Sequence, residues 1–409
     1  MIVKKKNVIA SLAIFLFIFI AFFFSSSITL FVEGGARPQG IENAEVLNDF
    51  FINKIYLIVF VCIFGIVSLI QRKIYILGFL KSDLFKVFIL FFWITFFQLL
   101  FGVDYRQDMI SYLIIIGIMF YSCWLIFNVV TPEQIFRSLN FFYFLMFMFS
   151  FFLIFLVPSY GISFGEDVWQ GAFNHKNNLG LFCASYGLVA IISFKVQPKL
   201  TLLNLLIAVI LCFGASSYTS LSCLIFIFLF ILIYKFLSKF FSIASLMIIL
   251  ISLLTSGMLV YFSVSGVNLP ILDKDFTFSG RNEIWLYSIL KISQSPIIGY
   301  GYGALGYQNN INSAAFFNAT GQVLGSNHNG FIGLLYNYGF PGFLIFIFFL
   351  VRYYRKSIVV KLNAKYSFFV AGFILLNTFE DRIFGIYITL FVLAVWFSYI
   401  DYYLSKGNR

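Results

Sequence analysis

The amino-acid sequence predicts an all-α, polytopic integral membrane protein in which about twelve transmembrane helices form a single domain, residues 1–409. Of the 409 residues, 61% are hydrophobic and 11% are charged, which leaves a soluble protein too little polar surface to cover its exterior. The apolar residues fall in blocks of ~20, the length that spans a hydrocarbon layer of ~30 Å. Basic residues are concentrated in alternate connections between these blocks, as the positive-inside rule requires.

The apolar blocks predict membrane spans at 8–31, 54–70, 84–102, 109–130, 139–158, 179–194, 200–215, 220–238, 242–264, 329–350, 366–379 and 384–402. The first block follows three lysines, but it is too long for a cleaved signal peptide and lacks a small-residue cleavage site. The span 366–379 is short for a crossing and ends in Glu380-Asp381-Arg382. We place this charged triplet at an outer turn between the last two spans.

The distribution of charge predicts the orientation. With the N-terminus in the cytoplasm, most of the 27 basic residues lie in inner segments and most of the 16 acidic residues in outer ones, so both termini are expected to be cytoplasmic. The longest outer segment, 265–328, is a loop within the membrane domain because it is too small to fold alone. The net charge of +11 is scattered between apolar blocks, and this excludes a nucleic-acid interface.

No cofactor or metal is expected. The cysteines all lie inside apolar blocks and are expected to be packing residues without a structural disulfide: Cys62, Cys123, Cys183, Cys212 and Cys223. No acidic cluster in the outer loops would hold Mg²⁺ or Mn²⁺, and two histidines without nearby acids make a poor zinc site. Glycosyl or phosphoryl chemistry in this chain should therefore rely on fixed positive side chains.

The two histidines of the chain are the first candidates for chemistry. His175 and His328 both fall in long outer segments, and each precedes polar residues, in His175-Lys176-Asn177-Asn178 and His328-Asn329-Gly330. A histidine titrates near neutrality, with a pKa of ~6.5, and this suits a general base. His328 is the stronger candidate, whereas an ordinary surface histidine remains an equal alternative for His175.

The segment 277–285 predicts the start of a helix on the outer face, capped by Ser279 and ended by Ser295-Pro296. Its amphipathic face is expected to rest on the membrane surface and carries Ile284, Ser288 and Ile292. Arg281 falls in the first turn, where the helix dipole disfavours a cation. A helix N-terminus with a guanidinium makes a good phosphate site; a membrane-surface anchor is the alternative.

A run of glycines follows at 299–306, and residues 301–306 match the dinucleotide pattern G-x-G-x-x-G. We reject this function because no strand and no βαβ unit accompanies the pattern. Gly301 and Gly303 then mark either a hinge or a backbone that substrate approaches closely. Glu380 and Arg382 lie beside hydrocarbon, where charges are tolerated only when paired or in a polar cavity.

Several motifs in order resemble the superfamily of O-antigen ligases and Wzy-type polymerases. They are Ser279-Gly280-Arg281-x-x-x-Trp285, Pro296-Ile297-Ile298-Gly299-x-Gly301-x-Gly303, Ser326-Asn327-His328-Asn329-Gly330 and Gly339-Phe340-Pro341-Gly342. The segment 171–180 and Asn377-Thr378-Phe379-Glu380 look like motifs of its exopolysaccharide polymerase branch. The resemblance covers residues 165–385. It departs at 216–220, where relatives commonly carry a basic residue and this chain has none.

The resemblance implies a membrane glycosyltransferase of GT-C type in a bacterial inner membrane, acting on the periplasmic side without a metal. His328 would be the base on the acceptor hydroxyl, Arg281 would bind the pyrophosphate of an undecaprenyl-linked glycan donor, and Lys176 would assist. The substrate would also meet polar and glycine positions: His175, Asn177, Gly301, Gly303, Asn329, Glu380 and Arg382. We expect these residues to face a cleft between 159–178 and 265–328.

Three functions stay open at this point. A polymerase of lipid-linked repeat units is favoured by the Lys176 loop together with the His328 motif, and a chain-length regulator protein is then a possible partner. An O-antigen ligase would use the same donor with a lipid A-core acceptor. A transporter or flippase is disfavoured because its polar sites would lie near the membrane midplane in related halves, whereas the polar clusters here lie at the outer ends of spans.

Overall fold

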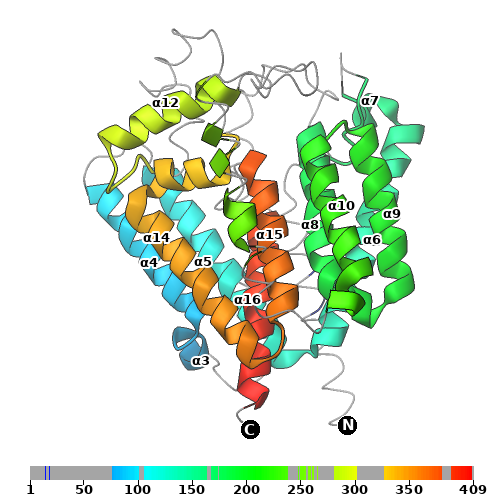
Figure 1. The fold of residues 1–409 in the computed structure, drawn as a ribbon, viewed down its shortest axis with the longest axis horizontal. Coiled ribbons are helices and arrows are strands. Elements are labelled where there is room, and N and C mark those ends of the chain that lie inside the picture. The colour runs from blue at the N-terminus through cyan, green and yellow to red at the C-terminus, as the bar shows by residue number, and fades with distance from the viewer. Residues whose placement is uncertain are drawn as a thin grey trace. The chain divides into compact units, whose positions relative to one another are not determined.

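The computed structural model describes residues 76–100, 106–163, 167–173, 175–237, 281–301, 327–379 and 388–407, with isolated positions at 14, 18 and between 247 and 265. Regular structure in these ranges is helical (Figure 1), apart from one isolated antiparallel bridge between Ile162 and Trp169. The predicted all-α fold is therefore confirmed for the described part of the chain.

Helices occupy the predicted spans that fall within the described ranges. They are α4 (Asp83–Leu100), α5 (Arg106–Val129), α6 (Pro132–Leu156), α8 (Lys176–Val196), α9 (Pro198–Gly214), α10 (Tyr218–Leu237), α14 (Gly330–Val359), α15 (Asn363–Phe379) and α16 (Ile388–Gly407). Three shorter elements accompany them: α3 (Ile76–Leu80), α7 (Pro158–Gly161) and α12 (Arg281–Gln294). The predicted spans 8–31, 54–70 and 242–264 lie outside the continuously described ranges.

Within the described residues, 5 helices are long and apolar enough to cross a membrane. They are α4, α6, α8, α14 and residues 388–405 of α16, and shorter apolar stretches occur in α5, α9 and α10. This supports a polytopic membrane protein. The count of about twelve spans, the GT-C architecture and the single-domain organisation stay predictions.

The chain divides into two compact units. The first unit comprises Met1–Lys86, Ile115–Phe236 and Ile386–Arg409, and the second comprises Val87–Ile114 and Leu237–Gly385. Each unit is assembled from stretches that are distant in the sequence. The boundaries after Lys86 and after Ile114 fall inside α4 and α5.

Hydrogen bonds between buried polar side chains hold the first unit together. The Tyr186 hydroxyl of α8 donates to Asn140 Oδ1 of α6 at 2.5 Å, and Asn140 Nδ2 donates to Thr201 Oγ1 of α9 at 3.0 Å. Asn204 Nδ2 donates to the Asn140 carbonyl at 2.8 Å. Buried polar groups are costly unless they are paired, so this network selects one packing of the three helices. The Trp396 indole of α16 donates to the Leu188 carbonyl of α8 at 3.2 Å.

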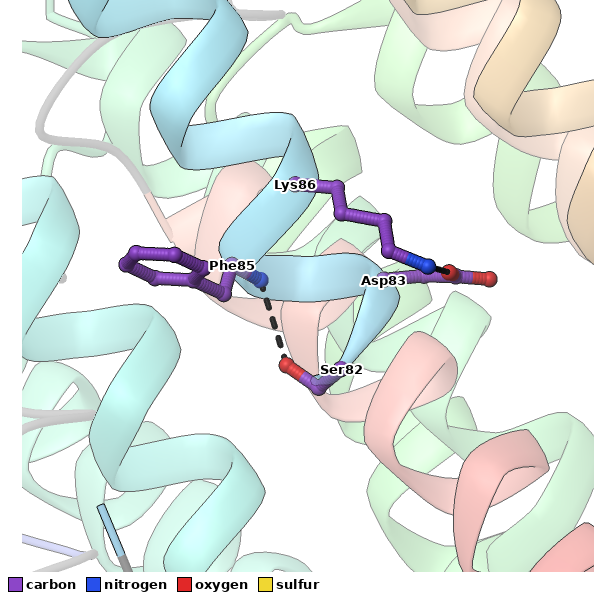
Figure 2. A network of polar contacts seen from close by, with 4 residues as sticks. All are labelled: Ser82, Asp83, Phe85 and Lys86. Carbon is purple, nitrogen blue, oxygen red and sulfur yellow. Dashed lines mark hydrogen bonds and ion pairs between the residues drawn. The ribbon is translucent and has the colours of Figure 1, made fainter. Parts of the chain in front are cut away.

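The first turn of α4 is fixed by two local polar contacts, which Figure 2 shows. The Phe85 amide donates to Ser82 Oγ at 3.2 Å, so Ser82 caps the helix by satisfying one of its orphan N–H groups. Lys86 Nζ lies 3.1 Å from Asp83 Oδ1. Asp83 is 3% exposed, and its negative charge is favourable at a helix N-terminus. The sequence Ser82-Asp83 therefore sets the residue at which this span begins.

The second unit contains a helix that is broken in its middle. α14 runs from Gly330 to Val359 but has a non-helical residue at Gly339, with φ 63° and ψ −172°. The bend separates a short helix, 330–338, from a longer apolar one, 340–359, and the gold and orange parts of α14 in Figure 1 run in different directions. The short helix lies under α12 and is largely buried.

The amphipathic face of α12 packs differently from our expectation. Ile284, Trp285 and Ile292 form a buried cluster with Ile332 and Tyr336 of α14. The face that was predicted to rest on the membrane surface is therefore covered by protein. An apolar stripe buries equally well against protein or lipid, so the pattern alone could not decide between them. The exposed apolar residues of α12 are Leu286, Ile289 and Leu290.

Candidate functional site

His328 occupies a constrained backbone position directly before α14. Its φ is 47°, in the left-handed region that few non-glycine residues adopt, although histidine is enriched among those that do. The imidazole is partly exposed, and its Nδ1 atom is buried. The neighbours on both sides, Asn327 and Asn329, are 0% and 1% exposed. The histidine is therefore an accessible side chain on a backbone that two buried asparagines fix.

Asn327 is bound to α12 through both its backbone and its side chain. The Trp285 indole donates to the Asn327 carbonyl at 2.9 Å, and the Ser288 hydroxyl donates to Asn327 Oδ1 at 2.6 Å. All three residues are fully buried. Hydrogen bonds in such dry surroundings are strong, and their partners are costly to leave unpaired. The residue before His328 is therefore held rigidly on α12.

Arg281 shares the face of α12 that makes these contacts. It precedes Trp285 by four residues and Ser288 by seven, so the three side chains lie along one side of the helix. Arg281 is also the first residue of α12, where backbone N–H groups lack partners within the helix. Arg281, the predicted phosphate ligand, and His328, the predicted base, thus belong to elements of the second unit that contact each other.

Asn329 has a structural function that the sequence did not reveal. Its Oδ1 accepts from the amides of Phe331 and Ile332, both at 3.0 Å, and thereby caps α14. Its Nδ2 donates to the Thr378 carbonyl of α15 at 2.8 Å. The side chain that we predicted to bind substrate is thus engaged in holding α14 against α15. The substrate contact itself stays a prediction.

The break in α14 is built from two of the sequence motifs, which exchange backbone hydrogen bonds. Phe340 donates its amide to the Pro296 carbonyl at 2.8 Å, whereas the Tyr336 carbonyl accepts from the Tyr300 amide at 2.8 Å. In a regular helix these two α14 groups would bond to each other. Pro341 has no N–H to offer the Asn337 carbonyl, which instead accepts from the Gly301 amide at 3.0 Å.

Glycines allow the 296–301 segment to approach the break in α14 closely. Gly299, Gly301 and Gly339 all have positive φ, at 71°, 89° and 63°. A Cβ on Gly299 would lie 2.7 Å from the Asn337 carbonyl oxygen, which is shorter than any real contact. The Gly301 amide is engaged within the protein, and the predicted approach of substrate to Gly301 stays a prediction. Gly303, Glu380 and Arg382 lie outside the described residues.

Two tyrosines cover the junction between these segments. The rings of Tyr300 and Tyr336 stack with centroids 4.8 Å apart, and the Tyr300 hydroxyl donates to the Lys291 carbonyl of α12 at 3.1 Å. Burial raises the pKa of Tyr300 above its ordinary value, so its hydroxyl stays a proton donor at neutral pH. The α12 helix, the 296–301 segment and the break in α14 therefore form one connected support for His328.

Gly339→Ala is expected to destabilise this support. The new Cβ would clash with the Ile297 carbonyl and lie 2.7 Å from that of Pro296, at a φ of 63° that alanine disfavours. A loss of more than ~1 kcal/mol in the free energy of unfolding is expected. The melting temperature in detergent should fall. Gly257→Ala, where no atom lies within 4 Å of the added Cβ, is the matched control, and equal melting temperatures of the two variants would contradict the clash.

His175, Lys176 and Asn177 belong to the first unit, at the start of α8. His175 Nδ1 accepts from the Asn177 amide at 3.1 Å and caps the helix. Because Nδ1 is an acceptor, a neutral His175 ring carries its proton on Nε2. The cap gives His175 a structural role, and that role favours the ordinary alternative over a base acting through Nδ1. Lys176 and Asn177 are partly exposed in the first turn.

The serine-rich turn between α9 and α10 lies beside this helix start. A Cβ on Gly180 of α8 would collide with Ser217 and lie 3.0 Å from Ser220 Oγ. The Trp169 amide of the preceding loop donates to the Gly214 carbonyl at 2.9 Å. The loop before α8, the start of α8 and the turn between α9 and α10 thus meet at one end of the first unit, and the charge pattern predicts the same side of the membrane for all three.

Sequence reasoning missed Gln98 of α4, which contacts the break in α14. Its only signal was an amide near the end of an otherwise apolar span. It also did not predict the hydrogen bond between Ser288 and Asn327, although Asn327 lies within a quoted motif. Among the described residues, no group of three or more His, Cys, Asp and Glu side chains could hold a metal ion.

Comparison with known proteins gives one family. Residues 200–347 match a family model described as O-antigen ligase (Wzy_C). The recognition made from the motifs is confirmed by this match, which includes Arg281 and His328. The family is a glycosyltransferase-like class of ligases and polymerases. No curated protein matches the chain.

Proposed function

We propose, on the premise that residues 200–347 form an O-antigen ligase domain, that this membrane protein polymerises oligosaccharide repeat units carried on undecaprenyl pyrophosphate. The reaction would take place at the periplasmic face of the inner membrane and would need no metal. Its donor and acceptor would both be lipid-linked glycans. One observation carries the proposal: the helix that starts at Arg281 is hydrogen-bonded to the residue that precedes His328.

The reaction would be a displacement at the anomeric carbon of the donor. His328 takes the proton of an acceptor sugar hydroxyl, and the hydroxyl oxygen forms the new glycosidic bond. The bond between the anomeric carbon and the pyrophosphate oxygen breaks, and the lipid pyrophosphate leaves with the electron pair. Negative charge grows on that leaving group, where a guanidinium and the first N–H groups of α12 stabilise it. Arg281 supplies this guanidinium, and Lys176 would add a second positive charge.

Rigid placement of the base supports this assignment. A general base must lie within ~2.6–3.2 Å of the proton that it removes, and small displacements reduce the rate strongly. The buried contacts of Asn327 and Asn329 hold the backbone on both sides of His328.

An O-antigen ligase is the second candidate, and the description of the matching family model favours it. The donor, the leaving group and the roles of Arg281 and His328 would be the same, but the acceptor would be a lipid A-core. Deletion of the gene separates the two functions on a gel of surface polysaccharide. Loss of a polymerase leaves single repeats on the core, whereas loss of a ligase leaves the core without any repeats.

Reconstitution tests the proposed chemistry directly. Purified full-length protein in liposomes is mixed with undecaprenyl-pyrophosphate-linked oligosaccharide and no nucleotide sugar. We expect longer glycans and released lipid pyrophosphate in the reaction with lipid-linked oligosaccharide alone. Lengthening that requires added lipid A-core would favour the ligase. Movement of the oligosaccharide across the bilayer without any change in its length would instead identify a transporter and refute the glycosyltransferase.

A further inference from the structure

Gln98 of α4 donates its two side-chain N–H groups to the 296–301 segment and to α14 beside its break. Its Nε2 atom lies 2.6 Å from the Ile298 carbonyl and 2.6 Å from the Asn337 carbonyl. Gln98 is 0% exposed. It lies outside residues 200–347 that match the family model, in a helix where the sequence showed only an apolar span. Gln98 therefore lies in a part of the chain to which neither the motifs nor the family match gives a role.

The orientation of this amide follows from its partners. Rotating the amide by half a turn would place Oε1 against the two carbonyl oxygens and repel them, so Nε2 must be the atom that faces them. The Oε1 atom is buried and has no hydrogen-bond partner among the described residues. Burying an acceptor in this way costs free energy. An apolar side chain at this position would avoid that cost, but it would not make the two hydrogen bonds to α14 and to the 296–301 segment.

The Asn337 carbonyl accepts hydrogen bonds from two donors, neither of which is its normal helical partner. Pro341 stands where the helix would supply an N–H, and Gly301 fills one of the two lone pairs. Gln98 fills the other and also bonds to the 296–301 segment. It therefore joins three elements at one point: α4, the glycine segment and the end of the short helix 330–338.

We propose that Gln98 is a positioning residue for His328, an inference that rests on the proposed function. The short helix of α14 begins two residues after His328 and is held at that end by Asn329 and Thr378. Gln98 holds its other end at Asn337. A helix of nine residues is only ~13 Å long and stiff. Without Gln98 the far end keeps only its backbone bonds to the 296–301 segment. The short helix then tilts about these bonds, and Asn329 and His328 at its other end shift away from the acceptor hydroxyl.

The variants Gln98→Met and Gln98→Glu test this role. Methionine keeps the shape and volume of glutamine but cannot donate. A glutamate at this buried position is neutral and has one O–H, so it can donate to only one of the two carbonyls. We expect turnover by both variants to fall at least ~10-fold, because misplacement of a reacting group by ~1 Å costs up to ~100-fold. The KM for the lipid-linked donor should stay unchanged, since Arg281 and the start of α12 are retained. Leu100→Met, on an exposed residue of the same helix, is the matched control.

Amide hydrogen exchange supplies a readout that does not need activity. In Gln98→Met, exchange should accelerate at residues 298–301 and 336–340 and stay unchanged along residues 366–376 of α15. Faster exchange together with wild-type turnover, or a loss that appears in KM instead of turnover, would overturn the positioning role. Unchanged exchange would overturn the clamp itself. A failure of the unaltered protein to lengthen glycan would instead refute the proposed function, so the failures remain distinguishable.

Discussion

His328→Asn is expected to abolish glycan transfer while the fold is retained. Asparagine adopts the left-handed backbone region readily, so it can occupy the φ of 47° that His328 has. An amide cannot accept a proton near neutral pH, and the loss of a general base lowers rates by ~10²–10⁴-fold. The initial rate of glycan lengthening in liposomes measures this loss. Surface polysaccharide on a gel should shift from long chains to single repeats.

Chemical rescue separates the loss of a base from the loss of structure. His328→Gly also tolerates the backbone conformation and leaves space beside Asn327 and Asn329. Added imidazole should restore part of the transfer by this variant and none of the transfer by His328→Asn. The melting temperatures of both variants should stay near that of the unaltered protein. Long chains at the normal rate in His328→Asn would exclude His328 as the base.

Much of the fold could be predicted because membrane spans have a simple sequence signal. Apolar blocks of sufficient length gave helices at the predicted places, from α4 through α16, wherever the structure describes them. The end of α12 was also predicted, since Pro296 cannot continue a helix. Its predicted cap, Ser279, lies outside the described residues. The bend in α14 occurs at a quoted motif, Gly339-Phe340-Pro341-Gly342.

The parts that escaped prediction depend on contacts between distant residues. Nothing local in the segment 296–301 indicates that its amides replace those missing from α14. Gln98 could have been noticed as a buried amide, but its partners lie far along the chain and become neighbours only after folding. Ser288 and Asn327 escaped for the same reason. A pattern of residue types reports the period of an element, and it does not report the partner of that element.

The second large effect is expected from Arg281→Lys, which retains the positive charge at the start of α12 and changes its shape. A guanidinium offers a planar fork that bonds two phosphate oxygens at once, whereas an ammonium acts as a point charge. Loss of a hydrogen bond to a charged group costs ~1.5–3 kcal/mol, so transfer should fall by ~10- to 100-fold. The rate of lipid pyrophosphate release in liposomes measures this effect.

The position of Arg281 makes stability and function separable in this variant. A cation in the first turn opposes the helix dipole, so α12 does not owe its stability to that charge, and lysine should leave the melting temperature unchanged. Lys291→Arg, at the other end of α12 where a cation is favourable, is the matched control and should transfer glycan normally. The loss should appear in reactions with the pyrophosphate donor. Near-normal chain length in Arg281→Lys would refute the proposed phosphate contact and leave Lys176 as the remaining candidate.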